Sequence, residues 1–216
     1  RKEQGSFMSS NIHTSFTLPN APAIPGLVFR LFRGEDDFPA IKAVRKRVQA
    51  VDGDVWLPGP DTDPDPVCNP LHDCLIVEVD GQAIGYTWLV WWSEPDVELF
   101  LHLGGLVPEW RRKGIGRVLL RWQEQRLRQI AQMHPTTKPC VFGANADETQ
   151  PGNQALLLSE GYKVAFTFVW MTYQIPTEPI QLAPLPDGLE IRAVSLEQLP
   201  TVYAANVEAF AESHDS

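Results

Sequence analysis

Apolar and polar residues follow two periodicities along the chain between residues 27 and 175. Runs rich in β-branched and aromatic residues predict strands, at 27–32, 74–79, 83–92, 97–107, 139–144 and 164–174. Apolar residues three or four positions apart predict helices, at 38–48, 114–133 and 152–159. The three central strands are joined by short links, among them Asp80-Gly81, and should form an antiparallel meander. The predicted order is β-α-β-β-β-α-β-α-β.

The segments outside this pattern divide the chain. Residues 1–26 are treated as an N-terminal tail, part of which could derive from a vector if Met8 is the natural start. Residues 27–175 form the predicted main domain. Residues 176–188 hold four prolines and no periodicity, which is typical of a linker.

An internal repeat follows the linker. Residues 189–205 resemble residues 27–44, and the alignment pairs Arg30 with Arg192 and Pro39 with Pro200. A strand and a helix cannot close a core of their own. We therefore expect residues 189–216 to be the start of a second, incomplete domain, cut from a longer natural protein.

Charge and composition narrow the classes of function. The formal net charge is −9, whereas a nucleic-acid-binding surface needs a basic patch. No apolar run approaches the roughly 18 to 20 residues of a membrane span, and the opening residues lack the apolar region of a secretory signal. The three cysteines are odd in number and have no CxxC spacing, which fits reduced thiols and no metal site. We expect a cytoplasmic protein that binds neither nucleic acid nor membranes.

The most informative segment, LHLGGLVPEWRRKGIGRVLLRW, runs from Leu101 to Trp122. In it a strand leads into a basic turn with two glycines that opens an amphipathic helix. Glycines let main-chain N–H groups approach a ligand without a Cβ in the way. The helix N-terminus adds about half a positive elementary charge, and Arg111, Arg112 and Lys113 add formal charge. The segment therefore predicts a pyrophosphate-binding site.

Two well-known phosphate-binding loops match this turn less well. A Walker A loop would need the pattern GxxxxGK[ST], which does not follow Gly105. A Rossmann turn would need GxGxxG directly after a strand of a parallel βαβ unit, whereas the preceding strands form a meander. The remaining alternative is a surface turn whose basic residues precede a core helix by chance. The order of strand, proline, basic turn and helix favours the phosphate site.

The stretch LVPEWRRKGIGRVLL resembles motif A of the GCN5-related N-acetyltransferases (GNAT), in which a strand ends V-x-P and [RQ]-x-x-G-x-[GA] follows. Leu106 stands at the valine position, Pro108 at the proline, Arg111 at the basic residue, and Gly114 and Gly116 at the glycines. The resemblance implies the α/β (α+β) GNAT fold, with a mixed, mostly antiparallel central sheet flanked by helices. It also implies acetyl-CoA as cosubstrate, lying in the splay between the fourth and fifth strands.

The resemblance also assigns the contacts to coenzyme A. They are residues at the end of the strand and in the turn: Leu106, Val107, Arg111, Arg112, Lys113, Gly114, Ile115, Gly116 and Arg117. The segment LLLSEGY resembles the late helix of the family, in which a tyrosine four residues before the glycine often protonates the leaving thiolate. Leu157 stands at that place, so the general acid stays unassigned.

Transfer to an amine also requires a base, because amines are protonated near neutral pH. Strand alternation places Glu98, His102 and Leu106 on one face. His102 is similar in position to a histidine of arylalkylamine acyltransferases, and histidine titrates near neutrality. A hydrogen-bonded core histidine is an equally good interpretation. Glu98 is the second candidate base, and Tyr162 or Tyr173 could supply an acid, although packing is the simpler role for both tyrosines.

We therefore expect an N-acyltransferase that passes an acyl group, normally acetyl, directly from acyl-CoA to a primary amine of a small molecule or peptide. The alternative is a non-catalytic acetyl-CoA-binding half of a tandem protein, because the repeat resembles the layout of two-domain GNAT proteins such as mycothiol synthase. The five aspartates of residues 51–70 could attract a cationic amine, but a solvated loop is the stronger interpretation. The apolar face of residues 189–216 would have to dock on the first domain or on a second chain, as in a homodimer.

Overall fold

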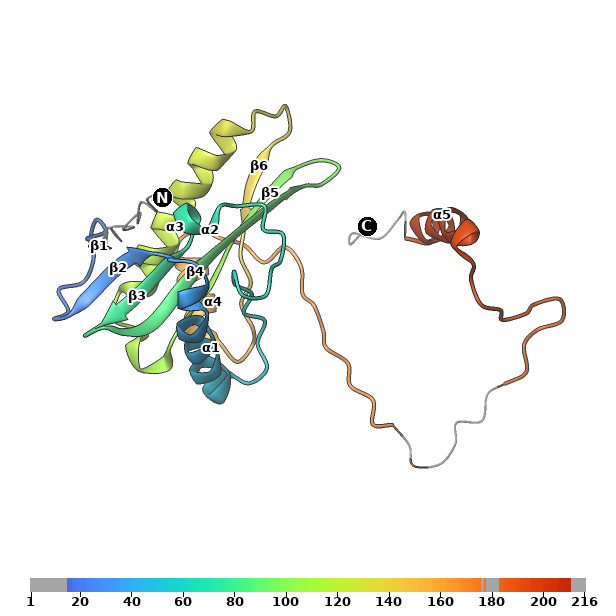
Figure 1. Cartoon of the computed structure of the whole chain (residues 1–216), viewed down its shortest axis with the longest axis horizontal. Coiled ribbons are helices and arrows are strands. Elements are labelled where there is room, and N and C mark those ends of the chain that lie inside the picture. Colours follow the sequence, from blue (N-terminus) through green and yellow to red (C-terminus); the bar gives the residue numbers. More distant parts are fainter. Residues whose placement is uncertain (1–14, 176, 178–182, 211–216) are drawn as a thin grey trace, which may run out of the picture. The chain divides into compact units, whose positions relative to one another are not determined.

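The computed structural model describes residues 15–175, 177 and 183–210 (Figure 1). The chain divides into two compact units, the first ending at Phe166 and the second beginning at Thr167. The first unit contains the sheet and all of the predicted site residues from Glu98 to Arg117.

A six-stranded sheet forms the centre of the first unit, with its strands in chain order. The strands are β1 (Ser15–Phe16), β2 (Leu27–Leu31), β3 (Leu75–Val79), β4 (Gln82–Ser93), β5 (Glu98–Leu106) and β6 (Cys140–Gly143). The first four ladders are antiparallel, and the ladder between β5 and β6 is parallel. The predicted meander and mixed sheet are therefore confirmed.

Three helices of the first unit, α1, α3 and α4, lie close to their predicted positions, and the short helix α2 was not predicted. They are α1 (Phe38–Asp52), α2 (Pro70–Asp73), α3 (Ile115–Met133) and α4 (Pro151–Ser159), with short 3₁₀ turns η1 (Glu35–Asp37) and η2 (Pro108–Trp110). A Cβ added at Gly105 of β5 would lie 3.7 Å from Val44 of α1. His102, on the other face of the same strand, is linked instead to Glu124 of α3 through the hydroxyl of Tyr162. Helices α1 and α3 thus cover different faces of the sheet.

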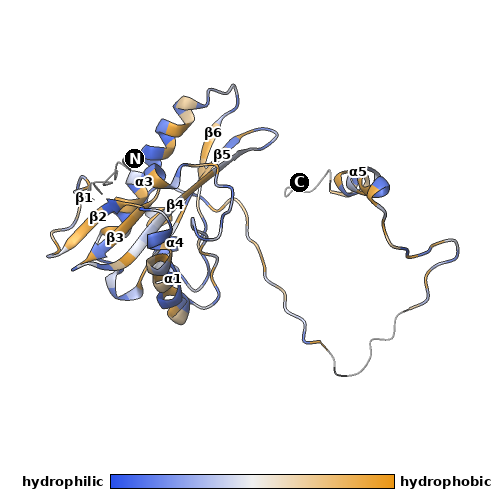
Figure 2. Ribbon diagram, in the orientation of Figure 1, coloured by the Kyte–Doolittle hydropathy of each residue, from blue (hydrophilic) through white to orange (hydrophobic). Residues whose placement is uncertain are grey.

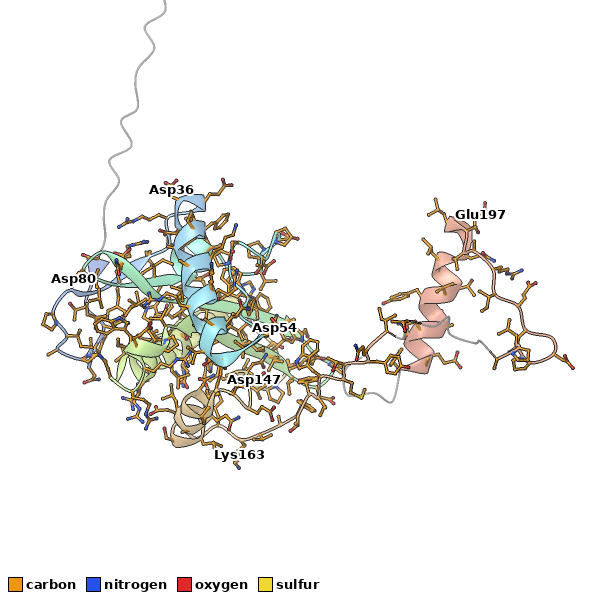
Figure 3. All side chains as sticks on the ribbon, turned by 90° about the horizontal axis from the view of Figure 1, so that it is seen from below. Asp36, Asp54, Asp80, Asp147, Lys163 and Glu197 are labelled. Atoms are coloured by element: carbon orange, nitrogen blue, oxygen red, sulfur yellow. The ribbon has the colours of Figure 1, made fainter. Side chains whose placement is uncertain are left out.

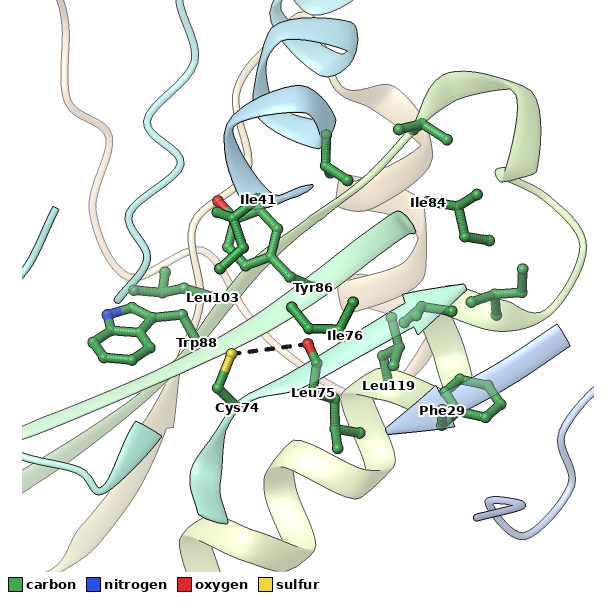
Figure 4. Packing of buried hydrophobic residues seen from close by; sticks show 14 of the residues in the cluster. Phe29, Ile41, Cys74, Leu75, Ile76, Ile84, Tyr86, Trp88, Leu103 and Leu119 are labelled. Carbon is green, nitrogen blue, oxygen red and sulfur yellow. Dashed lines mark hydrogen bonds between the residues drawn. The ribbon is translucent and has the colours of Figure 1, made fainter. Parts of the chain in front are cut away.

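The core lies where both faces of the central strands are covered. Apolar residues gather along the strands in Figure 2, and all side chains of β4 from Ile84 to Leu89 are buried. Figure 4 shows Tyr86 of this run pointing toward Ile41 of α1. The polar Thr87 is tolerated there because its hydroxyl accepts the N–H of Leu75 at 2.9 Å. Charged residues such as Asp36 and Lys163 lie at the periphery of the unit (Figure 3).

Two boundary predictions for the first domain are wrong in part. Residues 15–26, assigned to a tail, add to the fold, because β1 pairs with β2 and Leu18 is buried against the core. The strand predicted at 164–174 does not form, although its alternating β-branched and aromatic residues favour one. Its side chains are exposed, Trp170 among them. Strand propensity is realised only when a neighbouring strand pairs with the segment.

The second unit contains the 3₁₀ turn η3 (Leu196–Gln198) and helix α5 (Leu199–Ala209). The residue before α5, Gln198, has φ −88° and ψ −13°, and the residue before α1, Asp37, has φ −91° and ψ −9°. Each helix then has a proline within its first two positions. The repeated sequences therefore adopt the same local conformation at these helix starts, although residues 189–194 form no strand.

Candidate functional site

Strands β5 and β6 separate halfway along β5. Their parallel pairing extends from Glu98 opposite Cys140 to Leu101 opposite Gly143. Beyond that point β5 continues to Leu106 paired only with β4. Strands β5 and β6 are the fourth and fifth of the strands predicted from the sequence, and they form the splay that was predicted between those two strands.

Main-chain groups of β5 are available along the open side of the splay. Val107 donates its N–H to Ile84 at 2.9 Å, so by alternation the groups of residues 103 and 105 also point toward β4. The main-chain N–H and C=O groups of His102, Gly104 and Leu106 point away from β4, toward the open side of the splay. Leu106 uses its carbonyl to accept a bond from Arg111 at 3.0 Å, and its N–H has no acceptor among the described residues.

Gly104 marks an irregularity in β5 beside the splay. Its φ is +146°, and a Cβ at this position would lie 2.3 Å from the carbonyl oxygen of Tyr86. Next to it, the amide of Gln123 from α3 donates to the carbonyls of Leu103 at 2.7 Å and Trp88 at 3.3 Å. Only glycine fits this close approach of β5 to β4, and the buried amide of Gln123 gives two neighbouring carbonyls a hydrogen-bond donor.

The turn before α3 presents a set of free main-chain donors. Arg112 has φ +60° and Gly114 has φ +88°, so the chain curls in the left-handed region twice within three residues. No acceptor occurs among the described residues for the N–H groups of residues 112–117. A Cβ at Gly116 would lie 3.3 Å from Leu156 of α4. These donors form a cradle at the positive end of the α3 dipole, closely bordered by α4.

The basic side chains of the cradle are only partly free. Arg111 forms two bonds of 2.7 Å to the carboxylate of Asp52, at the end of α1. Arg117 lies 2.8 Å from Glu160, and the ammonium group of Lys113 lies 4.5 Å from the ring centroid of Trp110. Arg111, which was expected to add charge for the phosphates, links α1, the end of β5 and the turn through these bonds and its bond to Leu106.

Asp52 is the buried partner of Arg111. Its side chain is 2% exposed and also accepts a 2.9 Å bond from the amide of Gln150 before α4. Burial opposes ionisation of Asp52, but the bonds from Arg111 and Gln150 outweigh it and hold its pKa below the usual value. A second loop aspartate, Asp61, is paired with Arg45 at 2.9 Å. These two residues therefore do not belong to a solvated acidic loop.

His102 lies at the point where the strands part, and it is 6% exposed. Its Nε2 lies 2.8 Å from the hydroxyl of Tyr162, which lies 2.9 Å from Oε1 of Glu124 on α3. Burial lowers the pKa of His102 to about 4. Burial and the bond to Glu124 raise the pKa of Tyr162. Both residues are therefore neutral near pH 7.

Sequence reasoning missed this association. The spacing of Glu124 points only to an i,i+4 pair with Arg128, which does form at 3.2 Å. Packing was the simpler of the two roles considered for Tyr162. The three residues of the association are 22 and 38 positions apart in sequence, counting from His102 to Glu124 and from Glu124 to Tyr162. No local pattern spans such separations, so only the fold brings them together.

Glu98, the second candidate base, lies at the other end of β5. Four residues of extended strand place it about 13 Å from His102 along the chain direction. Its carboxylate accepts bonds from Ser93 at 3.0 Å and Thr136 at 3.3 Å. The two candidates thus occupy different parts of the strand, and only His102 lies where the splay begins.

Comparison with known proteins agrees with this geometry. Residues 43–138 match the family described as Acetyltransferase (GNAT) family. The first unit has the GNAT fold. A GCN5-related N-acetyltransferase from Sphaerobacter thermophilus is similar with a TM-score of 0.53 and 19% identity. The match covers 68% of this chain and 45% of that chain, so the chain spans less than half of the Sphaerobacter protein.

Further structures are more distant. A predicted acetyltransferase with acetyl-CoA from Clostridium acetobutylicum has a TM-score of 0.44 and 16% identity, over 68% of this chain and 96% of that chain. An aminoglycoside N-acetyltransferase in complex with CoA has a TM-score of 0.46 and 12% identity, over 72% and 99%. No curated protein matches the sequence.

Leu157, at which the sequence resemblance led us to look for a tyrosine, is 9% exposed. The hydroxyl nearest to the splay residue His102 belongs instead to Tyr162, five residues later in the chain. Among the described residues no group of His, Cys, Asp or Glu could hold a metal ion. None of the described helices is long and apolar enough to cross a membrane.

Proposed function

We propose that the protein is an acetyl-CoA-dependent N-acetyltransferase that passes the acetyl group directly to a primary amine. One observation carries this proposal: an open strand splay leads to a cradle of main-chain donors at the start of α3. A thioester ligand with a pyrophosphate in its middle needs both features at once, a slot for an extended arm and donors for two phosphates.

The cradle fits the pyrophosphate of coenzyme A. The N–H groups of residues 112–117 would bind the phosphate oxygens, and the side chain of Arg112, which has no partner among the described residues, would add charge. Gly114 and Gly116 keep this surface free of side chains. Lys113 and Arg117 border it, whereas Arg111 supports the turn through Asp52.

The splay fits the arm that carries the thioester, and the cosubstrate supplies an activated acyl group. The N–H of Leu106 would bind this arm or polarise the thioester carbonyl, since it points into the splay. Val107, the other residue expected here, uses its N–H for Ile84 and its carbonyl for Trp110. Of the two residues, we therefore assign this contact to Leu106.

His102 is the base that fits this reaction best. It is neutral near pH 7, so it can accept a proton from the attacking amine. It also lies at the start of the splay, whereas Glu98 lies about 13 Å along the strand. Removal of the imidazole in His102→Ala should lower the rate about 10²- to 10⁴-fold. An unchanged rate would indicate that Glu98 or water acts as the base.

The test of the function is an acceptor screen with acetyl-CoA and a panel of primary amines, following release of the free thiol. At least one amine should promote release. The variant Gly114→Glu/Gly116→Glu should lose coenzyme A binding, because two carboxylates would enter the cradle. Gly34→Glu is a matched control, since Gly34 also has a positive φ but has nothing within 4 Å of an added Cβ. Retained binding in the folded double variant would place the pyrophosphate elsewhere.

The second candidate is a non-catalytic acetyl-CoA-binding half of a tandem GNAT protein. Two observations favour it: the repeated helix start at Gln198, and Leu157 in place of the usual tyrosine. In this case the chain would bind coenzyme A with the same dependence on the cradle glycines. No amine in the panel would then promote thiol release.

A further inference from the structure

Three polar side chains from three parts of the fold form a hydrogen-bonded line beside the splay. His102 on β5 contacts the hydroxyl of Tyr162 after α4, at 2.8 Å. That hydroxyl contacts Oε1 of Glu124 on α3, at 2.9 Å. The other oxygen of Glu124 accepts a bond from Arg128 at 3.2 Å. The line therefore runs from the point where β5 and β6 part to an ion pair on α3.

The chemistry of the groups determines the direction of these bonds. A carboxylate only accepts, so the hydroxyl of Tyr162 donates its proton to Glu124. The tyrosine oxygen is then left to accept from His102, and Nε2 of His102 must carry a hydrogen. A neutral imidazole has one N–H, so Nδ1 of His102 carries the free lone pair.

Nδ1 of His102 has access to open space. No hydrogen-bond partner of this atom occurs among the described residues. No side-chain nitrogen or oxygen in the described part of the chain is both fully buried and without a partner. Nδ1, which has no partner, is therefore not fully buried. His102 itself is the first residue of β5 beyond the last pair with β6.

We propose that Tyr162 and Glu124 are positioning residues that hold His102 as the Nε2–H tautomer, so that Nδ1 takes the proton from the acceptor amine. This proposal rests on the proposed function. It gives Tyr162 a role different from that of an acid acting on sulfur, because Tyr162 acts here through the ring of His102. In catalytic triads a carboxylate orients the histidine directly. Here Glu124 would orient His102 through the hydroxyl of Tyr162.

The proton balance of the step closes for the neutral amine, once the ammonium form has released its extra proton to water. The amine nitrogen forms a bond to the acyl carbon while its N–H proton passes to Nδ1. The positive charge that develops on the ring is stabilised by the line to Tyr162 and Glu124. The carbon–sulfur bond then breaks, and the proton passes from Nδ1 to sulfur. An amine and a thioester thus become an amide and a thiol, and His102 is neutral again.

Charged groups near the line come from two elements. Glu124 and Arg128 face it from α3, and Glu160 faces it from the end of α4. Glu160 itself pairs with Arg117 at 2.8 Å and Arg121 at 3.2 Å and forms no bond to Tyr162. Glu160→Gln is therefore a matched control for Glu124→Gln, because both remove one nearby carboxylate but only one of them ends the line.

The first test uses ¹⁵N NMR of the full chain with ¹⁵N-labelled histidine, with His102 assigned by loss of its signals in His102→Gln. At pH 7 the native protein should show His102 as the Nε2–H tautomer, and it should stay neutral well below the pH at which an ordinary histidine titrates. Tyr162→Phe should mix the two tautomers, since Nε2–H loses its acceptor. Glu160→Gln should leave the tautomer unchanged. A native Nδ1–H tautomer, or an unchanged one in Tyr162→Phe, would overturn the proposal.

The second test uses the amine found in the acceptor screen. Tyr162→Phe and Glu124→Gln should lower kcat by at least about tenfold and leave the KM for acetyl-CoA unchanged. Both variants misplace the imidazole of His102, which acts in the chemical step and not in binding acetyl-CoA. Normal kcat in both variants would overturn the positioning role. A failed acceptor screen in the native protein would instead overturn the proposed function. The NMR test needs no acceptor, so it still shows whether Tyr162 fixes the tautomer of His102.

Discussion

The ion pair between Asp52 and Arg111 should contribute strongly to stability, and Asp52→Asn tests it. The substitution keeps the size of the side chain and a partner for Gln150, but it removes the charge that receives two 2.7 Å bonds from Arg111. Removing one partner of a buried ion pair costs about 3–5 kcal/mol. Arg111 is 29% exposed and can regain water, whereas Asp52 is 2% exposed. The free energy of unfolding should therefore fall by about 2–3 kcal/mol, at or below the lower end of that range.

Urea unfolding followed by tryptophan fluorescence measures this change. Asp54→Asn is the matched control, because Asp54 is exposed two residues after Asp52 (Figure 3) and a surface substitution of this kind stays within about 0.5 kcal/mol. A double-mutant cycle with Arg111→Gln should show coupling between the two positions. Equal stability of Asp52→Asn and Asp54→Asn, or additive effects in the cycle, would refute this stabilising role of the ion pair.

The dependence on pH provides an independent check. The pKa of Asp52 is lowered in the folded protein, so its contribution is complete above the ordinary aspartate value of about 3.9 and is lost as pH falls toward the folded value. The stability difference between the native protein and Asp52→Asn should therefore shrink between pH 5 and pH 3. A difference that stays constant over this range would mean that Arg111 does not stabilise the ionised carboxylate.

Two further predictions follow from backbone and burial. Gly104→Ala should destabilise the first unit by at least about 2 kcal/mol in urea unfolding, because the added Cβ would meet the carbonyl of Tyr86 at 2.3 Å at a φ of +146°. Native-like stability would show that β5 and β4 can move apart here at little cost. A thiol reagent should modify Cys140 rapidly in the native state, since Cys140 is exposed, while burial raises the pKa of Cys68 to about 12 and also raises that of Cys74. Reaction of three thiols at equal rates would contradict this burial.

The sequence alone was sufficient for the features that depend on neighbours in the chain. The meander follows from short links such as Asp80-Gly81, and the sheet has these strands in this order. The cradle follows from the basic turn and the two glycines at 114 and 116, because backbone conformation and the helix dipole are local properties. The structure retains both, and it also retains the short helix start that residues 27–44 and 189–205 share.

The tertiary structure decided which side chains meet. Local charge suggested that Asp52 would be solvated, but the end of α1 brings it to Arg111 across 59 positions of the chain. The same applies to the line from His102 through Tyr162 to Glu124, whose members come from a strand, a residue after α4 and the middle of α3. The strand expected at 164–174 had the right residues but pairs with no strand among the described residues. Periodicity reports which face of an element is apolar, whereas pairing, burial and ion pairs depend on the other elements that fold against it.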